Sequence, residues 1–264
     1  MTAMRTIAAA LSIALLSPAV ARADNVSVPC RVKAELVRLA HPLPRVANKL
    51  AAGQPLKIVA IGSSSTAGAG ASKPELNYPN RLQAELTASF PRQKITMINR
   101  GINGEEIGDM LRRFDNAVIA EKPDLVLWQL GTNSVLRDHP FDGRGASIRE
   151  GLGKIKRIGA DVVLIDPQFA PKVIAKPDAE KMVRLIGVTA KSENVDLFQR
   201  YEVMRNWRDT DRITFDTFVS ADGLHMNDWS YGCLAKSLAV AIVEAATRPV
   251  ASASAISIPA YDPF

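Results

Sequence analysis

The chain has 264 residues, of which 47% are apolar and 23% charged, with a formal net charge of +6. This length and composition fit a single soluble globular domain with one sizeable core. The Lys and Arg residues are scattered among acidic neighbours, without a basic stripe or interleaved aromatic residues, which argues against a nucleic-acid-binding protein. No stretch after the N-terminus is long and apolar enough for stable insertion into a membrane.

The N-terminus has the physical parts of a secretory signal peptide. Arg5 precedes a short apolar run over residues 7–16, and residues 21–23 read Ala-Arg-Ala, the small residues of a cleavage site. The alternative is a membrane anchor, but the run is too short to span a bilayer comfortably. We therefore expect removal of residues 1–23, a mature chain starting at Asp24, and a periplasmic or secreted protein.

The remaining chain is expected to form one domain over residues 24–250. Residues 251–264 are small and polar with two prolines, which is typical of a weakly ordered tail or one laid along the surface. Export would place Cys30 and Cys233 in an oxidising compartment, so we expect a disulfide between them. The alternative is two buried free thiols. Neither cysteine has the flanking residues of a zinc site, and no metal is expected.

Strand and helix patterns alternate along the chain. Short β-branched or continuously apolar runs predict strands, and the segments between them have helical patterning. Such alternation requires crossover connections and therefore a mostly parallel sheet. The predicted fold is a three-layer α/β/α sandwich with five strands. The strands are expected at residues 57–61, 94–98, 124–130, 160–165 and 195–198, and the helices at 32–39, 78–90, 105–120, 146–158, 178–192 and 229–247.

The first segment that can carry chemistry follows the first predicted strand. Residues 62–68 read Gly-Ser-Ser-Ser-Thr-Ala-Gly, and small residues there let a tight turn present one hydroxyl at the start of a helix. A phosphate-cradling loop is the rival interpretation, but the Gly-Lys-Ser/Thr ending is missing. The segment also differs from the Gly-x-Ser-x-Gly elbow, because Thr66 occupies the second glycine position.

Two further segments follow the second and third strands. Residues 99–104 (Asn-Arg-Gly-Ile-Asn-Gly) can bring a backbone N–H close to a ligand, although glycine also serves an ordinary turn there. Residues 131–134 (Gly-Thr-Asn-Ser) place Asn133 where its amide can face a developing negative oxygen. The alternative for Asn133 is an Asx turn or helix cap. Ligands of open parallel sheets bind at this end of the strands.

The fourth segment contains Asp222 and His225. The chain has three histidines, and the other two, His41 and His139, lie beside prolines in expected loops. A carboxylate three residues before an imidazole can reach the ring, fix its tautomer and stabilise its charged form. The alternative is an ordinary surface pair ahead of a capped helix. Together the four segments supply a nucleophile, oxyanion donors, a base and a group that orients the base.

In this order the segments resemble the four blocks of the SGNH hydrolases, also called GDSL esterases. The resemblance covers most of the chain from residue 57 onward, and the Gly-x-Asn and Asp-x-x-His pieces are the more specific ones. It places the nucleophile at Ser64, with Ser63 and Ser65 as alternatives in the serine run. Two positions depart from the family pattern, since Ser63 precedes the nucleophile where the family has Asp, and Ser134 follows the block-three Asn where Asp is frequent.

The resemblance implies a serine esterase without metal or cofactor. In this scheme His225 removes the Ser64 proton, Asp222 orients the ring, and the oxyanion is held by the Ser64 and Gly101 N–H groups and the Asn133 side chain. The expected substrate is a small acyl ester, such as an O-acetyl group on a glycan. Rival functions are an acyltransferase using the same acyl-enzyme, a lipase or lysophospholipase, and a non-catalytic glycan-binding module on this fold.

Two more residues are candidates for contact with the substrate. Tyr78 follows the nucleophile segment closely and could line an acyl pocket. Gln168 lies just beyond the fourth predicted strand and could face the site, although a solvent-facing turn is the alternative for it. Oligomeric state leaves no signature in the sequence.

Overall fold

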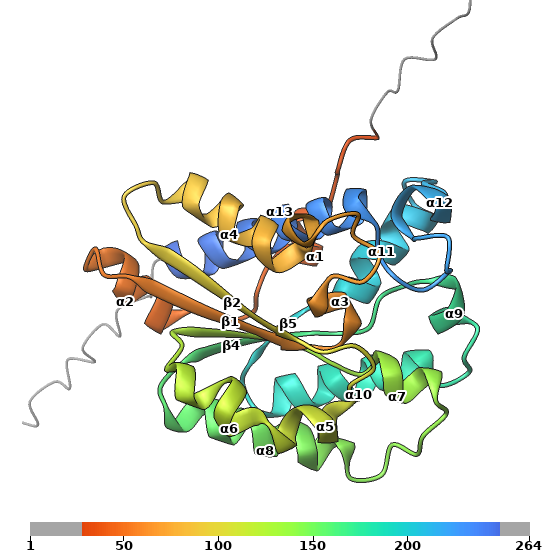
Figure 1. The fold of residues 1–264 in the computed structure, drawn as a ribbon, viewed down its shortest axis with the longest axis horizontal. Coiled ribbons are helices and arrows are strands. Elements are labelled where there is room, and N and C mark those ends of the chain that lie inside the picture. Colours follow the sequence, from red (N-terminus) through yellow and green to blue (C-terminus); the bar gives the residue numbers. More distant parts are fainter. Residues whose placement is uncertain (1–27, 249–264) are drawn as a thin grey trace, which may run out of the picture.

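The computed structural model describes residues 28–248 and has one central sheet. Its five strands are all parallel and follow the order β2-β1-β3-β4-β5 (Figure 1). The strands are β1 (Leu56–Gly62), β2 (Ile95–Gly101), β3 (Leu125–Gln129), β4 (Asp161–Ile165) and β5 (Asp196–Phe198).

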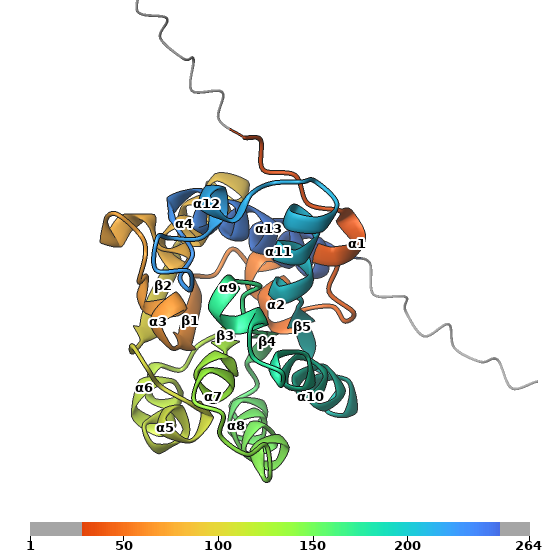
Figure 2. The same ribbon diagram turned by 90° about the vertical axis from the view of Figure 1, so that its right-hand side faces the viewer.

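Helices cover both faces of the sheet (Figures 1 and 2), as parallel crossovers require. One face carries α1 (Ala34–Val37), α2 (Pro44–Ala51), α4 (Tyr78–Ser89), α11 (Arg200–Asp209) and α13 (Asp228–Thr247), and the other carries α5 (Ile107–Arg112), α6 (Phe114–Ala117), α8 (Arg144–Arg157) and α10 (Ala179–Ser192). The short helices are α3 (Ser64–Ala67), η1 (Pro74–Leu76), η2 (Ile119–Glu121), α7 (Thr132–Leu136), α9 (Pro171–Ile174) and α12 (Phe215–Phe218).

The core lies between the sheet and these two helical layers. Strand β3 is buried at every position, and Trp128 on it packs edge-on against Phe114 of α6. Trp128 is therefore a core residue. A strand with both faces covered must be apolar throughout, which is the pattern that its sequence has.

The predicted α/β/α sandwich is confirmed, and all five strands lie where they were expected. The single helix predicted over residues 105–120 is wrong, because the segment divides into α5, α6 and η2. A capping box between Glu106 and Asp109 delays the start of α5. Its end is set by Arg113, whose guanidinium reaches back to the Glu105 carboxylate and the Arg100 carbonyl. These contacts with strand β2 and its loop override the local helical pattern.

Two helices of the sheet's first face were not predicted. Helix α2 begins with Pro44, a common first residue of helices. Helix α11 is rich in charged residues, and its buried face includes Tyr201, Met204 and Trp207. Its sequence contains so many charged residues that the apolar face was not recognised. The face becomes clear only from its packing in the folded protein. The segment expected as a helix over residues 32–39 is helical only at α1.

The expected disulfide between Cys30 and Cys233 is present, with a Cα separation of 5.4 Å. It attaches the N-terminal arm to α13. Two tryptophan indole N–H groups hold the same arm, since Trp229 donates to the Val28 carbonyl at 2.7 Å and Trp207 donates to the Arg31 carbonyl at 3.2 Å. The expected signal peptide over residues 1–23, the expected mature start at Asp24 and the expected tail over 251–264 lie outside the described residues.

Candidate active site

The serine run lies at the junction of β1 and α3, with Ser63 between the two elements and Ser64 and Ser65 at the start of the helix. Strand β1 ends at Gly62, where a Cβ atom would lie 2.2 Å from the Thr66 hydroxyl, so only glycine fits. Ser63 and Ser65 are 2% and 1% exposed, whereas Ser64 is 8% exposed and is the first residue of α3. Of the three hydroxyls, the one on Ser64 lies against a histidine.

His225 lies between Ser64 and Asp222. Its Nε2 is 2.9 Å from the Ser64 Oγ, and its Nδ1 is 2.5 Å from the Asp222 Oδ2. The other Asp222 oxygen accepts the backbone N–H groups of Leu224 and His225, each at 2.9 Å. With Nδ1–H donating to the carboxylate, Nε2 is left as the acceptor for the serine proton.

The Asp222 carboxylate is stabilised in its ionised form. Partial burial raises its pKa, but hydrogen bonds from the His225 ring and from the two backbone amides outweigh this effect, and the net pKa lies below the ordinary value. An ionised carboxylate is what the ring needs in order to take up a proton during reaction. The arrangement can therefore activate the Ser64 hydroxyl as a nucleophile.

The expected oxyanion donors are only partly available. The Ser64 N–H begins α3 and has no acceptor within that helix. Asn133 donates one amide hydrogen to the Glu105 carbonyl at 2.8 Å, which leaves its second hydrogen. The Gly101 N–H, in contrast, donates to the Asn99 side chain at 2.9 Å, and a Cβ atom on Gly101 would lie 2.1 Å from the backbone nitrogen of Ala67.

A different glycine of the same loop has the free amide. Gly104 has a φ of +79°, and its N–H donates no hydrogen bond among residues 28–248. It directly precedes Glu105, whose carbonyl receives the Asn133 amide. Gly101 was the glycine expected from the family pattern. The hydrogen bonds favour Gly104 instead.

Neither of the two residues expected to contact the substrate, Tyr78 and Gln168, is exposed at the surface. Tyr78 is fully buried, its hydroxyl lies 3.0 Å from Thr66 Oγ1, and burial raises the pKa of Tyr78 to about 12. Gln168 is fully buried too, and its Oε1 accepts the Thr132 hydroxyl at 2.9 Å. Both side chains support the loops of the site from behind.

Two buried polar residues at the site were missed by the sequence analysis. Gln129 ends strand β3, and its Oε1 accepts both the N–H (2.9 Å) and the hydroxyl (3.1 Å) of Ser63. Arg200 is fully buried at the start of α11 and donates to the Asp166 carbonyl and the Gln168 side chain. A glutamine at the end of an otherwise apolar strand is a usable sequence signal, because buried polar groups are uncommon and paired.

Ser134 belongs to a cluster centred on Glu106. The Glu106 carboxylate accepts hydrogen bonds from the Ser134 hydroxyl (2.9 Å) and from Arg137 (2.8 Å) and Arg144 (3.1 Å), and it lies 2.8 Å from His139 Nδ1. Desolvation raises the pKa of Glu106, but these partners lower it more strongly, to about 2. The cluster ties the loop before α5 to helix α7.

Residues 28–248 contain neither a candidate metal site nor a helix that could span a membrane. This part of the chain contains no group of three or more His, Cys, Asp or Glu side chains that could hold a metal ion. No helix in it is both long and apolar enough to cross a membrane.

Comparison with known proteins identifies relatives of the sequence. The model of the Non-GDSL lipase-like family matches residues 29–248. An acetylxylan esterase of Geobacillus stearothermophilus is 30% identical, in a match covering 46% of this chain and 63% of that protein. An arylesterase of Vibrio mimicus is 31% identical over 44% of this chain and 56% of that protein. The matches thus span less than two thirds of either curated relative.

Solved structures of esterases have the same fold. A two-domain esterase active on acetylated mannans superposes with a TM-score of 0.70 at 23% identity, covering 88% of this chain and 61% of that chain. Axe2, an acetylxylan esterase from Geobacillus stearothermophilus, superposes with a TM-score of 0.59 at 22% identity, covering 71% of this chain and 94% of that one. At these identities the likeness is one of fold.

Proposed function

The chain belongs to the Non-GDSL lipase-like family, and from this premise we propose that it is an exported serine esterase that removes a small acyl group, such as acetyl, from a glycan. One observation carries the proposal, namely the continuous contact from Ser64 Oγ through the His225 ring to Asp222. The Gly62-Ser63-Ser64 turn also lacks the Asp of a Gly-Asp-Ser turn, in keeping with the family's description.

The proposed reaction has two halves. His225 Nε2 takes the Ser64 proton as Oγ attacks the ester carbonyl, and the imidazolium then gives that proton to the departing alcohol as the ester C–O bond breaks. In the second half His225 deprotonates a water molecule, which attacks the acyl-serine. The imidazolium then returns the proton to Ser64 Oγ as the acyl C–O bond breaks and the carboxylic acid leaves. Asp222 stays ionised throughout and stabilises the charged ring.

The negative oxygen of each tetrahedral intermediate needs donors placed before the reaction begins. We assign this role to the Ser64 N–H, the second amide hydrogen of Asn133 and the Gly104 N–H. The assignment to Gly104 replaces Gly101, whose N–H already has a side-chain acceptor. Removing one donor of this kind typically lowers turnover about 10²–10³-fold.

The substrate and the compartment are inferred from different observations. An acetylxylan esterase among the sequence relatives and an esterase active on acetylated mannans among the structural ones support an acylated glycan as substrate. The disulfide supports an oxidising compartment, since such bonds persist outside the cytosol. The secretory pattern of residues 1–23 agrees with export.

The first experiment is labelling with a fluorophosphonate, followed by peptide mapping and hydrolysis of p-nitrophenyl acetate. We expect the label on Ser64 and loss of both labelling and turnover in Ser64→Ala. Ser65→Ala is the matched control, because Ser65 is adjacent and buried, and its hydroxyl has no partner within the described chain. A folded wild-type protein that neither reacts nor turns over ester would support a binding module instead.

A further inference from the structure

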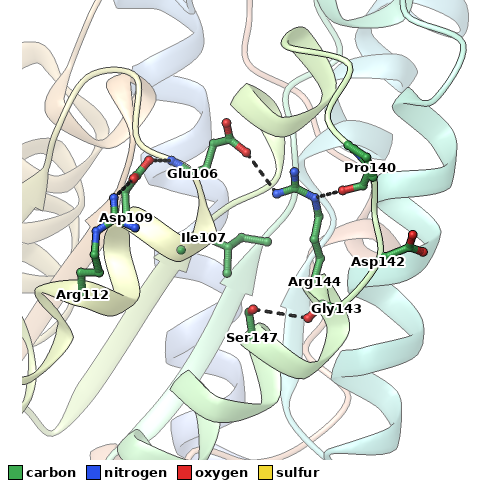
Figure 3. Close-up of a pocket in the computed structure, with 10 residues that line it drawn as sticks. Glu106, Ile107, Asp109, Arg112, Pro140, Asp142, Gly143, Arg144 and Ser147 are labelled. Atoms are coloured by element: carbon green, nitrogen blue, oxygen red, sulfur yellow. Dashed lines mark hydrogen bonds and ion pairs between the residues drawn. The ribbon is translucent and has the colours of Figure 1, made fainter.

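A polar pocket lies between helices α5 and α8, next in the chain to the loop that contains Gly104 and Glu105. It has a volume of about 380 Å³ and is open to solvent (Figure 3). One wall is formed by Glu106 and helix α5 up to Arg112, and the other by residues between Pro140 and Ser147. This volume lies within the usual range for small-ligand sites.

The pocket begins at the residue that follows Glu105, the hydrogen-bond partner of Asn133. Glu106 lines the pocket and accepts a hydrogen bond from Ser134. The residue before it, Glu105, accepts the Asn133 amide through its carbonyl. Two consecutive residues, Glu105 and Glu106, thus connect the Asn133 amide with the lining of the pocket.

The charges around the pocket do not favour an anionic occupant. Glu106 is paired with Arg144, and the Asp109 carboxylate is paired with Arg112 (Figure 3). Asp142 also lines the pocket, and its carboxylate has no ion-pair or hydrogen-bond partner within residues 28–248. Arg137 also pairs with Glu106, so three guanidinium groups balance the three carboxylates around the pocket. A balanced lining gives no net attraction for the phosphate of a lipid head group or the carboxylate of an acidic sugar.

The polarity of the pocket disfavours a long acyl chain. Only Ile107 and Pro140 among its lining residues are apolar, whereas Asp142, Asp109 and Ser147 present hydroxyl or carboxylate oxygens. Such groups exchange hydrogen bonds with hydroxyl groups of a ligand. Gly108 and Gly143 also line the pocket, and because they carry no side chain they leave space in it for a ligand.

We propose that this pocket binds neutral sugar residues of the glycan that carries the ester. The inference rests on the proposed function for the position of the ester, but glycan binding by the pocket can be measured without turnover. The pocket receives the alcohol part of the substrate. A second pocket, lined by Phe215 and Asp216 beside the Asp222 loop, is the competing location.

Binding is best measured by calorimetry on the Ser64→Ala protein with xylotetraose and mannotetraose as probes. Ser147→Trp fills the pocket with a large ring, and we expect at least a tenfold rise in Kd. Asp142→Asn retains the shape and removes one charged acceptor, and we expect a rise of about three- to tenfold, the effect of about one hydrogen bond. Asp216→Asn is the matched control, being an exposed aspartate of the second pocket.

Equal Kd values for Ser147→Trp, Asp142→Asn and the parent would overturn the proposal, as would a raised Kd in Asp216→Asn alone. Tighter binding of tetragalacturonate than of the neutral probes would contradict the charge argument. If Ser147→Trp fails to fold, Asp142→Asn still tests the proposal, because the Asp142 side chain is exposed and its replacement should leave the fold intact. If the wild type binds the probes through this pocket but cleaves no acetyl ester, the proposed function fails while the pocket assignment stands.

Discussion

The two halves of the site differ in how they are supported. The nucleophile turn is buried, with Ser63, Ser65 and Thr66 at most 2% exposed. The segment that holds the base lies at the surface, where the side chains of Asp222 and His225 are 43% and 19% exposed. The sheet fixes the first half, whereas the hydrogen bonds that hold the side chains of the second half are local.

The local bonds of the second half depend heavily on Asp222. One of its oxygens holds the His225 ring and the other accepts two backbone amides of the same turn. A bridge between Val219 and Met226 and a bond from the Ser220 N–H to the His225 carbonyl close the loop. The segment that follows β4 also holds it, since the Lys172 N–H donates to the Gly223 carbonyl and the Gln168 side chain to the Leu224 carbonyl. Replacements here should affect the chemistry first, and replacements in the buried half should affect stability as well.

Replacing Asp222 by Asn should have the largest effect. An Asn oxygen can still accept the two backbone amides, so the turn should keep its shape. The amide nitrogen would face His225 Nδ1 and favour the wrong tautomer, and kcat should fall about 10²–10⁴-fold. Steady-state kinetics with p-nitrophenyl acetate and a circular dichroism spectrum check this. Undiminished turnover would remove Asp222 from the catalytic group.

Removing the disulfide tests how much the attachment of the N-terminal arm to α13 stabilises the protein. This helix follows the segment of Asp222 and His225. Because the bond closes a loop with a sequence separation of 203 residues, Cys30→Ser should lower the free energy of unfolding by about 2–5 kcal/mol. Turnover should change little, since neither cysteine contacts the triad candidates. Denaturant unfolding measures the loss, with Cys233→Ser and the double variant as controls. A double variant much less stable than either single one would mean that the cysteines act separately.

A substitution at Gln129 tests how strongly the buried half of the site depends on the hydrogen bonds to Ser63. Gln129→Met retains the approximate volume but leaves the Ser63 N–H and hydroxyl without their acceptor, which should cost about 1–3 kcal/mol per buried group. We also expect slower fluorophosphonate labelling of Ser64, because its turn loses a support. Gln54→Met, at an exposed position, is the control. A stable variant with an unchanged labelling rate would show that the turn holds its own geometry.

The difference between the halves also explains what the sequence could predict. The strands, the serine run and the pair Asp222 and His225 are local patterns, and each was found where expected. Gln129 is marked in the sequence as a polar residue that ends an apolar strand, but its partner Ser63, like the partners of Arg200, is set only when the sheet and helices assemble. The choice of Gly101 over Gly104 likewise depended on which N–H the Asn99 side chain occupies.

The smallest expected effect concerns Glu106 and pH. Its pKa is lowered from 4.5 to about 2 in the folded protein, with desolvation opposing and the hydrogen bonds from Arg137, Ser134 and Arg144 dominating. A group with a depressed folded pKa adds stability above its unfolded pKa, and this contribution is lost as the pH falls from about 4.5 toward 2. Glu106→Gln should therefore lower Tm at pH 7, by about 2–4 °C for each kcal/mol lost.

The gap in Tm between wild type and Glu106→Gln should narrow as the pH is lowered through that window, because the wild-type carboxylate becomes protonated too. Glu244→Gln is the comparison variant, since Glu244 also pairs with an arginine but lies at the surface of α13. Solvent screens an exposed pair, so its gap at pH 7 should be smaller. A gap for Glu106→Gln that stays constant from pH 7 to pH 2 would mean that the cluster stabilises the loop through packing and not through the Glu106 charge.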